Sequence, residues 1–495
     1  MKRINNFILL ASLCLSMLVA QAQVKNLTLD QTIKLACNNS LNAHSARNTF
    51  LSNYWAYRSY KAARLPSLSL SMIPLKYSRT FTSRYDSQTN SDVYRQQQSL
   101  YSYGNLALQQ NVDLTGGTFY FDSELGFYKN YGNSSYQQFS TVPFRVGYSQ
   151  NLIGYNSFKW EKQIEPLKYE KAKQILLYRM EEIAETATSY FFNLAMAQVT
   201  YDLAKKSLES SDTLYHIGID RKQIASISQA DVLTLKLDWI NAGNNLKNAE
   251  IDLKKTSFSI ANFLHLDKKD LPLLELPEKP ANISVSAEYA LELVRRYNPD
   301  YLSSRQSLLE AEQTVEKTIR SSKMDANLNM SIGFNQVASS FTESLQNPIE
   351  QDVISLSLTV PLVDWGVRKG KVNMAKNQLN VTRLSAEQNQ QSLEEEILQT
   401  ISNFSVQQDM ISSAEEARAL ADLAYEATKQ RYIIGKAEIS SLTLAQNRQE
   451  NARKNYISAL RNYWLSYMKI QKLTLFDFTN HKPLSTDFES RYGIH

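Results

Sequence analysis

An internal repeat is the feature that most constrains how this chain can fold. Gly154 closes a strand-like segment and opens a long helical pattern, and Gly366 does the same about 210 residues later. Two segments that interrupt helical patterns, Arg221–Ala225 and Arg431–Gly435, are separated by nearly the same distance. A recurring order of motifs at a fixed spacing indicates two copies of one design. We therefore expect two structural repeats, 23–283 and 284–475.

Each repeat has the same order: helix, strands, a very long helix, a break and a shorter helix. In the first repeat we expect a helix over 29–64, strands within 67–152, a long helix over 155–214, a tip near 215–228, a helix over 226–264 and a linker over 265–283. In the second we expect a helix over 285–323, strands within 326–362, a long helix over 367–430, a tip over 431–440 and a helix over 438–474. Residues 476–495 are expected to form a polar C-terminal tail.

The long helices have the pattern of a coiled coil. Apolar residues in the first one alternate at spacings of four and three: Leu176, Met180, Ile183, Ala187, Tyr190 and Leu194. This spacing is typical of a helix that packs along a continuous seam. A helix of some 60 residues is about 90 Å long at 1.5 Å per residue, which is far more than a globular domain needs.

The strands alternate between apolar and polar residues. Leu68, Leu70 and Met72 alternate with serines, and so do Ile354, Leu356 and Leu358. A soluble antiparallel sheet with one buried face has the same pattern. The concentration of Tyr and Phe between residues 77 and 155 favours a membrane barrel, in which aromatic girdles flank an apolar outer band. Since the helices flanking each strand group lie on one side of the membrane, we expect two strands in the second repeat and two or four in the first.

The N-terminus has the features of a secretory signal peptide. Lys2 and Arg3 precede an apolar run, and Ala20 and Ala22 supply the small residues of a cleavage site. We expect residues 1–22 to be removed by cleavage between Ala22 and Gln23. The apolar run is shorter than the roughly 20 residues of a spanning helix, so a membrane anchor is disfavoured.

Composition argues against nucleic-acid binding and against catalysis. A net charge of +5 over 495 residues offers no strong positive field for a nucleic-acid backbone. The five His residues are scattered without the spacing of a metal site, and Gly116–Gly117 lacks the Lys-Ser/Thr of a phosphate-binding loop. We therefore expect no enzyme activity, no cofactor and no nucleic-acid partner.

The order of these motifs resembles the TolC family of outer membrane efflux proteins. The resemblance rests on the strand-to-helix transitions at Gly154 and Gly366, and on the break Arg431–Gly435 followed by Leu442–Asn447. A weaker copy of the break lies at Arg221–Ala225. The resemblance implies a mixed α and membrane β fold. An outer-membrane β-barrel would continue into a long periplasmic α-helical barrel, closed only as a homotrimer.

That resemblance also implies a function and partners. The trimer would be the passive exit duct of a tripartite efflux pump or type I secretion system, located in the outer membrane with its helical barrel in the periplasm. Its partners would be a periplasmic adaptor protein, an inner-membrane pump and outer membrane lipid. The alternatives are a stand-alone porin, which needs no helices of this length, and a structural periplasm-spanning coiled coil, which needs no lipid-facing strands.

An oligomer is also required by the strand count. Four to six strands per chain are too few for a spanning barrel of at least eight, and open sheet edges cannot face lipid. Three chains would give 12 strands, or 18 if the hairpin around Thr115–Gly117 also spans the membrane. Both numbers remain open from the sequence.

The helix breaks are the candidate gate. The resemblance implies that they form the periplasmic tip, with Arg221, Arg431 and Tyr432 hydrogen-bonded between neighbouring helices. Asp231 matches a position where the family places a carboxylate facing the narrowed pore, but its second copy is Ser441, so a doubled acidic ring is absent. Ile434 and Gly435 belong to the second tip, and Ala225 takes the place of Gly435 in the first. The alternative interpretation is ordinary basic and aromatic helix ends.

Overall fold

The structure is a computed structural model that describes residues 26–131, 135–223, 227–266, 273–278 and 283–493. The predicted signal peptide with Ala22 and Gln23, the tip residue Ala225 and much of the predicted linker lie outside the described residues. Two compact units divide the chain. The helical unit comprises Met1–Phe50, Lys173–Tyr301 and Gln390–His495, and the sheet unit comprises Leu51–Ala172 and Leu302–Asn389.

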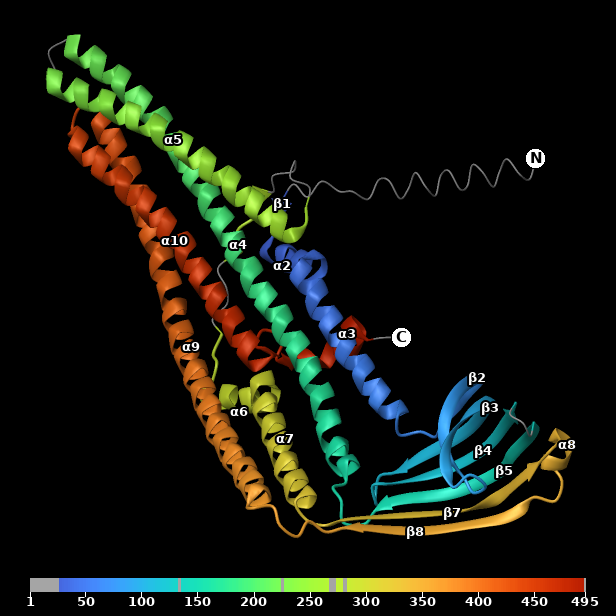
Figure 1. The fold of residues 1–495 in the computed structure, drawn as a ribbon. Coiled ribbons are helices and arrows are strands. Elements are labelled where there is room, and N and C mark those ends of the chain that lie inside the picture. The colour runs from blue at the N-terminus through green and yellow to red at the C-terminus, as the bar shows by residue number, and fades with distance from the viewer. Residues whose placement is uncertain (1–25, 132–134, 224–226, 267–272, 279–282, 494–495) are drawn as a thin grey trace, which may run out of the picture. The chain divides into compact units, whose positions relative to one another are not determined.

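The elements follow one another in two similar series (Figure 1). The first series is β1 (Asn26–Leu27), α2 (Leu29–Asn39), α3 (Leu41–Ala62), β2 (Ser67–Asp86), β3 (Ser91–Val112), β4 (Gly117–Asn130), β5 (Tyr136–Asn151), α4 (Ser157–Gln223) and α5 (Gln229–Leu264). The second is β6 (Leu273–Leu274), α6 (Ala287–Tyr297), α7 (Pro299–Ser321), β7 (Asp325–Ala338), α8 (Phe341–Ser344), β8 (Ile349–Thr359), α9 (Val367–Ile433) and α10 (Ile439–Thr474). The chain then forms β9 (Phe476–Asp477), β10 (Lys482–Pro483), η1 (Leu484–Asp487) and α11 (Phe488–Tyr492).

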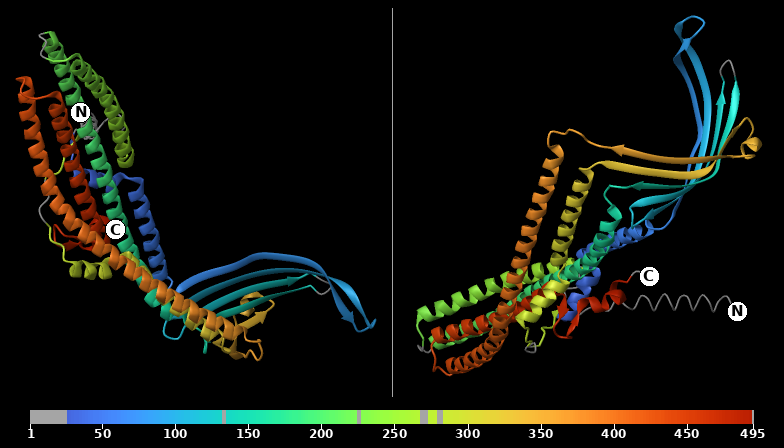
Figure 2. Two further views of the ribbon diagram at one scale, coloured as in Figure 1. Left: turned by 90° about the vertical axis from the view of Figure 1, so that its left-hand side faces the viewer. Right: turned by 90° about the horizontal axis from the view of Figure 1, so that it is seen from below.

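The sheet unit contains one six-stranded antiparallel sheet. Its strand order is β2-β3-β4-β5-β7-β8, so β5 of the first repeat pairs with β7 of the second, and β2 and β8 are the edges. The sheet is twisted and curved along its strands (Figure 2). Four strands therefore come from the first repeat and two from the second, within the range that the sequence left open.

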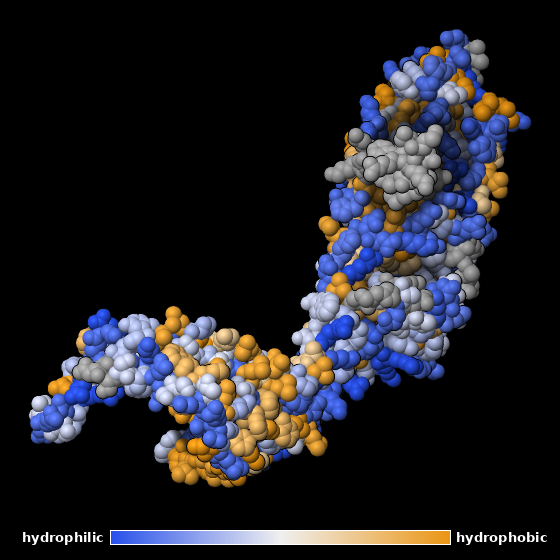
Figure 3. Space-filling model, turned by 90° about the vertical axis from the view of Figure 1, so that its right-hand side faces the viewer, coloured by the Kyte–Doolittle hydropathy of each residue, from blue (hydrophilic) through white to orange (hydrophobic). Residues whose placement is uncertain are grey.

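The two faces of the sheet differ in polarity, as the alternating pattern predicts. Cross-strand partners place apolar residues on one face, which we call the apolar face: Leu68, Leu70, Met72, Leu106, Leu108, Phe119, Phe121, Val146, Met330, Ile332, Ile354, Leu356 and Leu358. All of these side chains are exposed, and apolar side chains gather over the strands in Figure 3. The opposite face, which we call the polar face, carries Ser69, Ser71, Asn105, Asp122, Glu124, Arg145, Asn329, Ser355 and Ser357.

The helical unit has a continuous core between α4, α9 and α10. Phe191 and Phe192 of α4 pack in one cluster with Phe404 of α9 and with Leu460 and Tyr463 of α10. Most of the predicted seam residues of α4 are buried, and Tyr190 is half-buried. Small residues in the same cluster, such as Ala184, Ala195 and Ala459, allow the helix backbones to approach closely.

Two helices that the sequence pattern predicts as single are each divided. The helix expected over 29–64 breaks at Ser40, whose backbone is extended and whose hydroxyl accepts a hydrogen bond from the Ala43 amide at 3.2 Å. The helix expected over 285–323 breaks at Asn298, which precedes Pro299. A residue before proline is disfavoured in helical conformation, and proline suits the first position of the next helix.

The expected first tip and the expected tail also differ from the structure. Helix α4 continues to Gln223, beyond the predicted end at 214, so the break before α5 is shorter than predicted. The C-terminal segment is not simply a polar tail, because Phe476, Phe478 and Phe488 are buried. Apolar side chains at three separated positions anchor this segment. Its polar composition did not indicate this. Within the described part of the chain, every helix is too short or too polar to cross a membrane.

Candidate functional site

Arg221 connects the ends of the two long helices. Its Nη2 atom donates hydrogen bonds to the carbonyl oxygens of Tyr432 at 3.0 Å and Ile433 at 2.9 Å, and its guanidinium lies 5.1 Å from the centre of the Tyr432 ring. The last carbonyls of a helix lack partners in their own helix, and a positive charge is favourable at that end. Arg221 of α4 therefore caps the C-terminus of α9.

Tyr432 is the central apolar contact of the same region. Its side chain is only 2% exposed and packs in a cluster with Leu214 of α4, Leu235 of α5, Tyr425 of α9 and Leu442 of α10. Burial raises the pKa of the Tyr432 phenol above its ordinary value. The hydroxyl has no hydrogen-bond partner within the described chain. Tyr432 thus joins four helices through its ring.

The turn after α9 requires the glycine that the sequence places there. Gly435 has a φ of +79°, its amide donates to the Tyr432 carbonyl at 2.9 Å, and the Lys436 amide donates to the Arg431 carbonyl at 2.7 Å. This pair of bonds is a Schellman motif, in which a left-handed residue ends the helix. The Arg431 side chain reaches the Lys436 carbonyl at 3.5 Å, so its described bond lies within its own turn. Ile434 is exposed.

Asp231 occupies the third position of α5 and forms a capping box with Ser228. The Ser228 amide and hydroxyl donate to Asp231 Oδ2 at 2.9 and 2.8 Å, and the Asp231 amide donates to Ser228 Oγ at 3.1 Å. The bonds from the Ser228 hydroxyl and amide lower the pKa of the Asp231 carboxyl. In the second copy, Ser441 takes the same position in α10 and is exposed, and the cap residue Glu438 makes no side-chain cap bond.

The strand-to-helix transitions are built differently in the two repeats. The Gly154 amide donates to Asn151 Oδ1 at 2.5 Å, and a Cβ at Gly154 would lie 2.4 Å from the Asn151 side chain. Gly366 instead has a φ of +90°, which favours glycine. Beside it, Arg368 bonds to Asp364 Oδ2 and lowers the pKa of that carboxyl to about 2.

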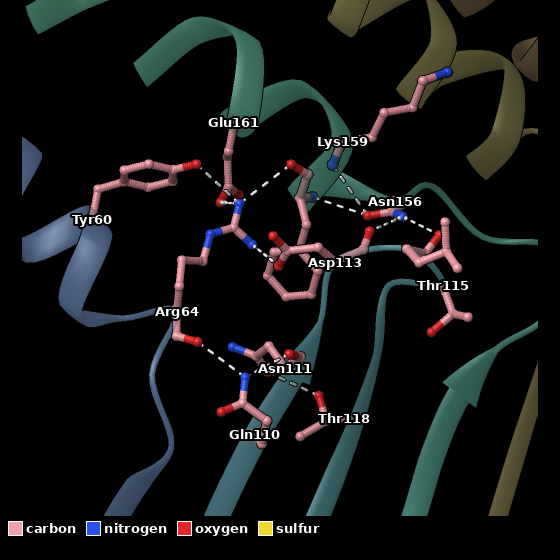
Figure 4. Close-up of polar contacts among 12 residues, drawn as sticks. Tyr60, Arg64, Gln110, Asn111, Asp113, Thr115, Thr118, Asn156, Lys159 and Glu161 are labelled. Atoms are coloured by element: carbon pink, nitrogen blue, oxygen red, sulfur yellow. Dashed lines mark hydrogen bonds and ion pairs between the residues drawn. The ribbon is translucent and has the colours of Figure 1, made fainter. Parts of the chain in front are cut away.

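A cluster that the sequence did not reveal holds the β3–β4 turn against the start of α4 (Figure 4). Arg64 donates to Asp113 Oδ1 at 2.7 Å and to the Phe158 carbonyl at 3.2 Å, and it lies 3.5 Å from Glu161 Oε2. Asn156 Nδ2 donates to the Asp113 carbonyl at 3.0 Å. We call these five residues the Arg64 clamp. Arg64 and Asp113 are 49 residues apart, so no helical or strand period connects them.

A second unpredicted cluster lies on the polar face. Arg145 Nε donates to Asp122 Oδ1 at 3.0 Å, and Arg145 Nη2 bonds to Glu124 as well. Asn105 Nδ2 completes the group at 3.3 Å from Asp122 Oδ2. The sequence feature that could have revealed this cluster is the pair of carboxylates two residues apart on the polar face of β4. Among the residues that the structure describes, no three His, Cys, Asp or Glu side chains gather in a way that could hold a metal ion.

Comparison with known proteins supports the resemblance seen in the sequence. Residues 290–474 match the family model described as "OEP: Outer membrane efflux protein". Among curated proteins, none matches the sequence.

Solved structures of outer membrane channels share the fold. The CmeC outer membrane channel of Campylobacter jejuni is 14% identical, with a TM-score of 0.66, and the match covers 94% of this chain and 88% of that chain. The outer membrane protein VceC of Vibrio cholerae is 16% identical, with a TM-score of 0.59 and coverages of 90% and 96%. The open state of the MtrE outer membrane channel of Neisseria gonorrhoeae is 14% identical, with a TM-score of 0.60 and coverages of 90% and 88%.

At these identities the likeness to solved structures concerns the fold, while the family match over residues 290–474 concerns the sequence itself. The two findings agree with each other and with the motifs at Gly366 and Arg431–Gly435, which both lie inside the matched range. Residues 290–474 thus match the outer membrane efflux protein family, and most of the chain has the fold of solved outer membrane channels.

Proposed function

We propose that three copies of this chain form the outer membrane exit duct of a tripartite efflux pump or a type I secretion system. The six strands of each copy contribute to a β-barrel in the outer membrane. The long helices contribute to an α-helical barrel in the periplasm. The duct is passive and performs no reaction of its own, because the pump supplies the energy and selects the cargo.

The observation that carries this proposal is the exposed apolar face of a sheet with two unpaired edges. Ile354 is 79% exposed and Leu356 is 64% exposed, both on edge strand β8. Contiguous apolar surface of this extent is unfavourable in water and favourable against lipid. Lipid in turn cannot satisfy the backbone groups of an open edge, so the sheet must close with other copies.

The polar face supports an aqueous interior. The Asp122 side chain is 5% exposed and is paired with Arg145, and Glu124 and Asn105 share the same group. Ionised groups inside a membrane are stable where they pair with one another and face a water-filled interior. With the apolar face toward lipid, this cluster faces the lumen.

The helices favour a duct over a stand-alone porin. Helices α4 and α9 contain 67 residues each, which corresponds to about 100 Å at 1.5 Å per residue. A porin has no use for such helices, and a structural rod has no use for the apolar face of the sheet. A duct uses both.

The tip residues support a partner-binding end that also narrows the pore. Ile433 and Ile434 are exposed at the end of α9, which gives the second tip an apolar surface for a periplasmic adaptor protein. Arg221 holds the end of α4 to the end of α9 in the same region. We therefore assign Arg221 as the tie that keeps the resting tip narrow, and Tyr432 as its apolar support.

The lipid-facing assignment is tested by a matched pair of substitutions in β8. Leu356→Arg places a charge on the apolar face and is expected to cost about 2–4 kcal/mol if it lies near the bilayer midplane. Ser357→Arg, on the polar face, is expected to be milder. The measurement is the amount of heat-modifiable trimer in the outer membrane fraction. Equal losses for the two variants, or recovery of the parent protein as a soluble periplasmic monomer, would contradict the assignment.

The tie at the tip is tested by Arg221→Ala. This variant removes two hydrogen bonds to the α9 carbonyls, each with a net value of about 1 kcal/mol, and three copies multiply the loss. Single-channel conductance in planar bilayers without a pump is expected to rise. Lys222→Ala, which changes the exposed neighbouring cation, is the control and should conduct like the parent. Unchanged conductance in Arg221→Ala would mean that Arg221 only caps a helix.

The predicted acidic ring at Asp231 makes a separate prediction about selectivity. Since its pKa is lowered, the carboxylate is ionised at neutral pH, and its charge and capping contribution are lost only as the pH falls through that lowered value. Asp231→Asn should reduce cation preference, measured as the reversal potential in a salt gradient, and should weaken block by multivalent cations. Ser441→Asp should shift the reversal potential the opposite way. Identical reversal potentials in all three proteins would leave Asp231 as a helix cap alone.

A further inference from the structure

The two edges of the sheet are complementary to each other. The order β2-β3-β4-β5-β7-β8 is antiparallel at every step and contains an even number of strands, so β2 and β8 run in opposite directions. If β8 of one copy lies beside β2 of the next, the two strands are therefore antiparallel, as are all other neighbours. A ring of copies joined in this way has no open edge.

The side chains of the two edges agree as well. Strand β2 presents Leu68, Leu70 and Met72 on the apolar face, and β8 presents Ile354, Leu356 and Leu358 on the same face. Between these apolar residues, the polar face carries Ser69 and Ser71 in β2 and Ser355 and Ser357 in β8. If the pairing of β2 with β8 shifted by one residue, the serines of one strand would face lipid. Only shifts by an even number of residues keep the apolar residues of both strands on the same face.

The lengths of the edges fit a spanning seam. Strand β8 has 11 residues, and a tilted strand that crosses a bilayer needs about 9–11. Strand β2 has 20 residues, so it provides a partner along the whole of β8. The part of the β2–β3 hairpin beyond the Ser99–Asn130 pair has no partner in β4 and extends past it.

The Arg64 clamp decides whether the β3–β4 hairpin belongs to the barrel wall. Arg64 follows α3, and Phe158 and Glu161 belong to the first turns of α4, while Asp113 begins the turn between β3 and β4. The clamp therefore holds that turn at the end of the sheet where the helices begin (Figure 4). Strand β4 pairs with β3 and with β5 along its length, so β3 and β4 are part of the sheet rather than folded aside. The Arg64–Asp113 pair at 2.7 Å fixes the turn between them.

From these observations we infer that three copies close an 18-stranded barrel, in which β2 of each copy pairs with β8 of the next. This inference rests on the proposed outer membrane duct and adds its partner surface, a second copy of this chain. It selects the larger of the two strand numbers that the sequence allows. Since barrel diameter grows with strand number, and barrels of 16–18 strands leave an aqueous channel, the wall encloses a wide lumen.

Disulfide trapping across the seam tests the inference in the full-length protein in outer membranes. In a Cys37→Ser background, Ser69→Cys on β2 is combined in turn with Ser355→Cys, Ser357→Cys or Thr359→Cys on β8, which sample the registers of correct parity. After mild oxidation with copper phenanthroline, at least one pair should convert most of the monomer band to covalent dimer and trimer on a denaturing gel. Reductant should return it to monomer.

Two further double variants serve as the control and the competitor. Ser149→Cys with Asn329→Cys joins neighbouring residues of β5 and β7 in the same copy. This pair should form a disulfide within one chain and give no covalent dimer or trimer. If β2 and β3 lay outside a 12-stranded barrel, Tyr120→Cys on β4, combined with the same β8 cysteines, would give the covalent dimer and trimer instead. Only variants that still give heat-modifiable trimer are compared.

The outcomes separate the inference from the proposed function. We expect covalent dimer and trimer from at least one Ser69→Cys combination and none from the Tyr120→Cys combinations. Covalent dimer and trimer from a Tyr120→Cys combination, or none from any β2–β8 pair in a protein that remains an outer membrane trimer, would overturn the 18-stranded seam and leave the duct. A parent protein that is a soluble monomer would overturn both.

Discussion

The structure depends above all on one constraint: a sheet with an exposed apolar face cannot end in unpaired strand edges. The face that includes Leu356 is unstable in water, and the edges β2 and β8 are unstable in lipid. In the proposed duct, closure by further copies satisfies both requirements. The ion-paired group of buried Asp122 and partly exposed Glu124 and Arg145 would then line the polar interior of that duct.

The two repeats share one plan but differ where function is expected. At the tip, the first repeat provides Arg221, and the second provides the carbonyls of Tyr432 and Ile433 that receive its hydrogen bonds. Asp231 caps its helix with Ser228, whereas Ser441 has no such partnership. Arg431 is the counterpart of Arg221 in the sequence, but in the described chain Arg221 bonds to the other helix end whereas Arg431 bonds to Lys436 in its own turn.

Much of this architecture could be predicted from the sequence because it depends on the regular spacing of apolar residues along strands and helices. The alternation of Leu68, Leu70 and Met72 identified a two-faced strand, and the spacing around Leu176 identified the packing seam of α4. The spacing of apolar residues could not reveal the break at Ser40, because that break depends on one side chain that caps a new helix. Nor could it reveal the Arg64–Asp113 pair, because contacts between residues far apart in the chain leave no local pattern.

The strand count shows the same limit. The sequence required an even number in the first repeat but left two or four open, since a turn at Gly116 can close either a spanning hairpin or a surface loop. The clamp on Asp113 and the continuous pairing of β3 with β4 determine that number, and both are tertiary contacts. At the tip, Arg431 was expected to join two helices, but its described bond stays within the turn that Gly435 makes possible.

If copies of this chain complete one another, the detergent-solubilised particle has the mass of several chains. Light scattering coupled to size-exclusion chromatography, corrected for bound detergent, measures the number of chains. We expect a particle of three chains that stays intact at low protein concentration. A particle containing one chain that is stable in detergent and still inserts as a channel would contradict it.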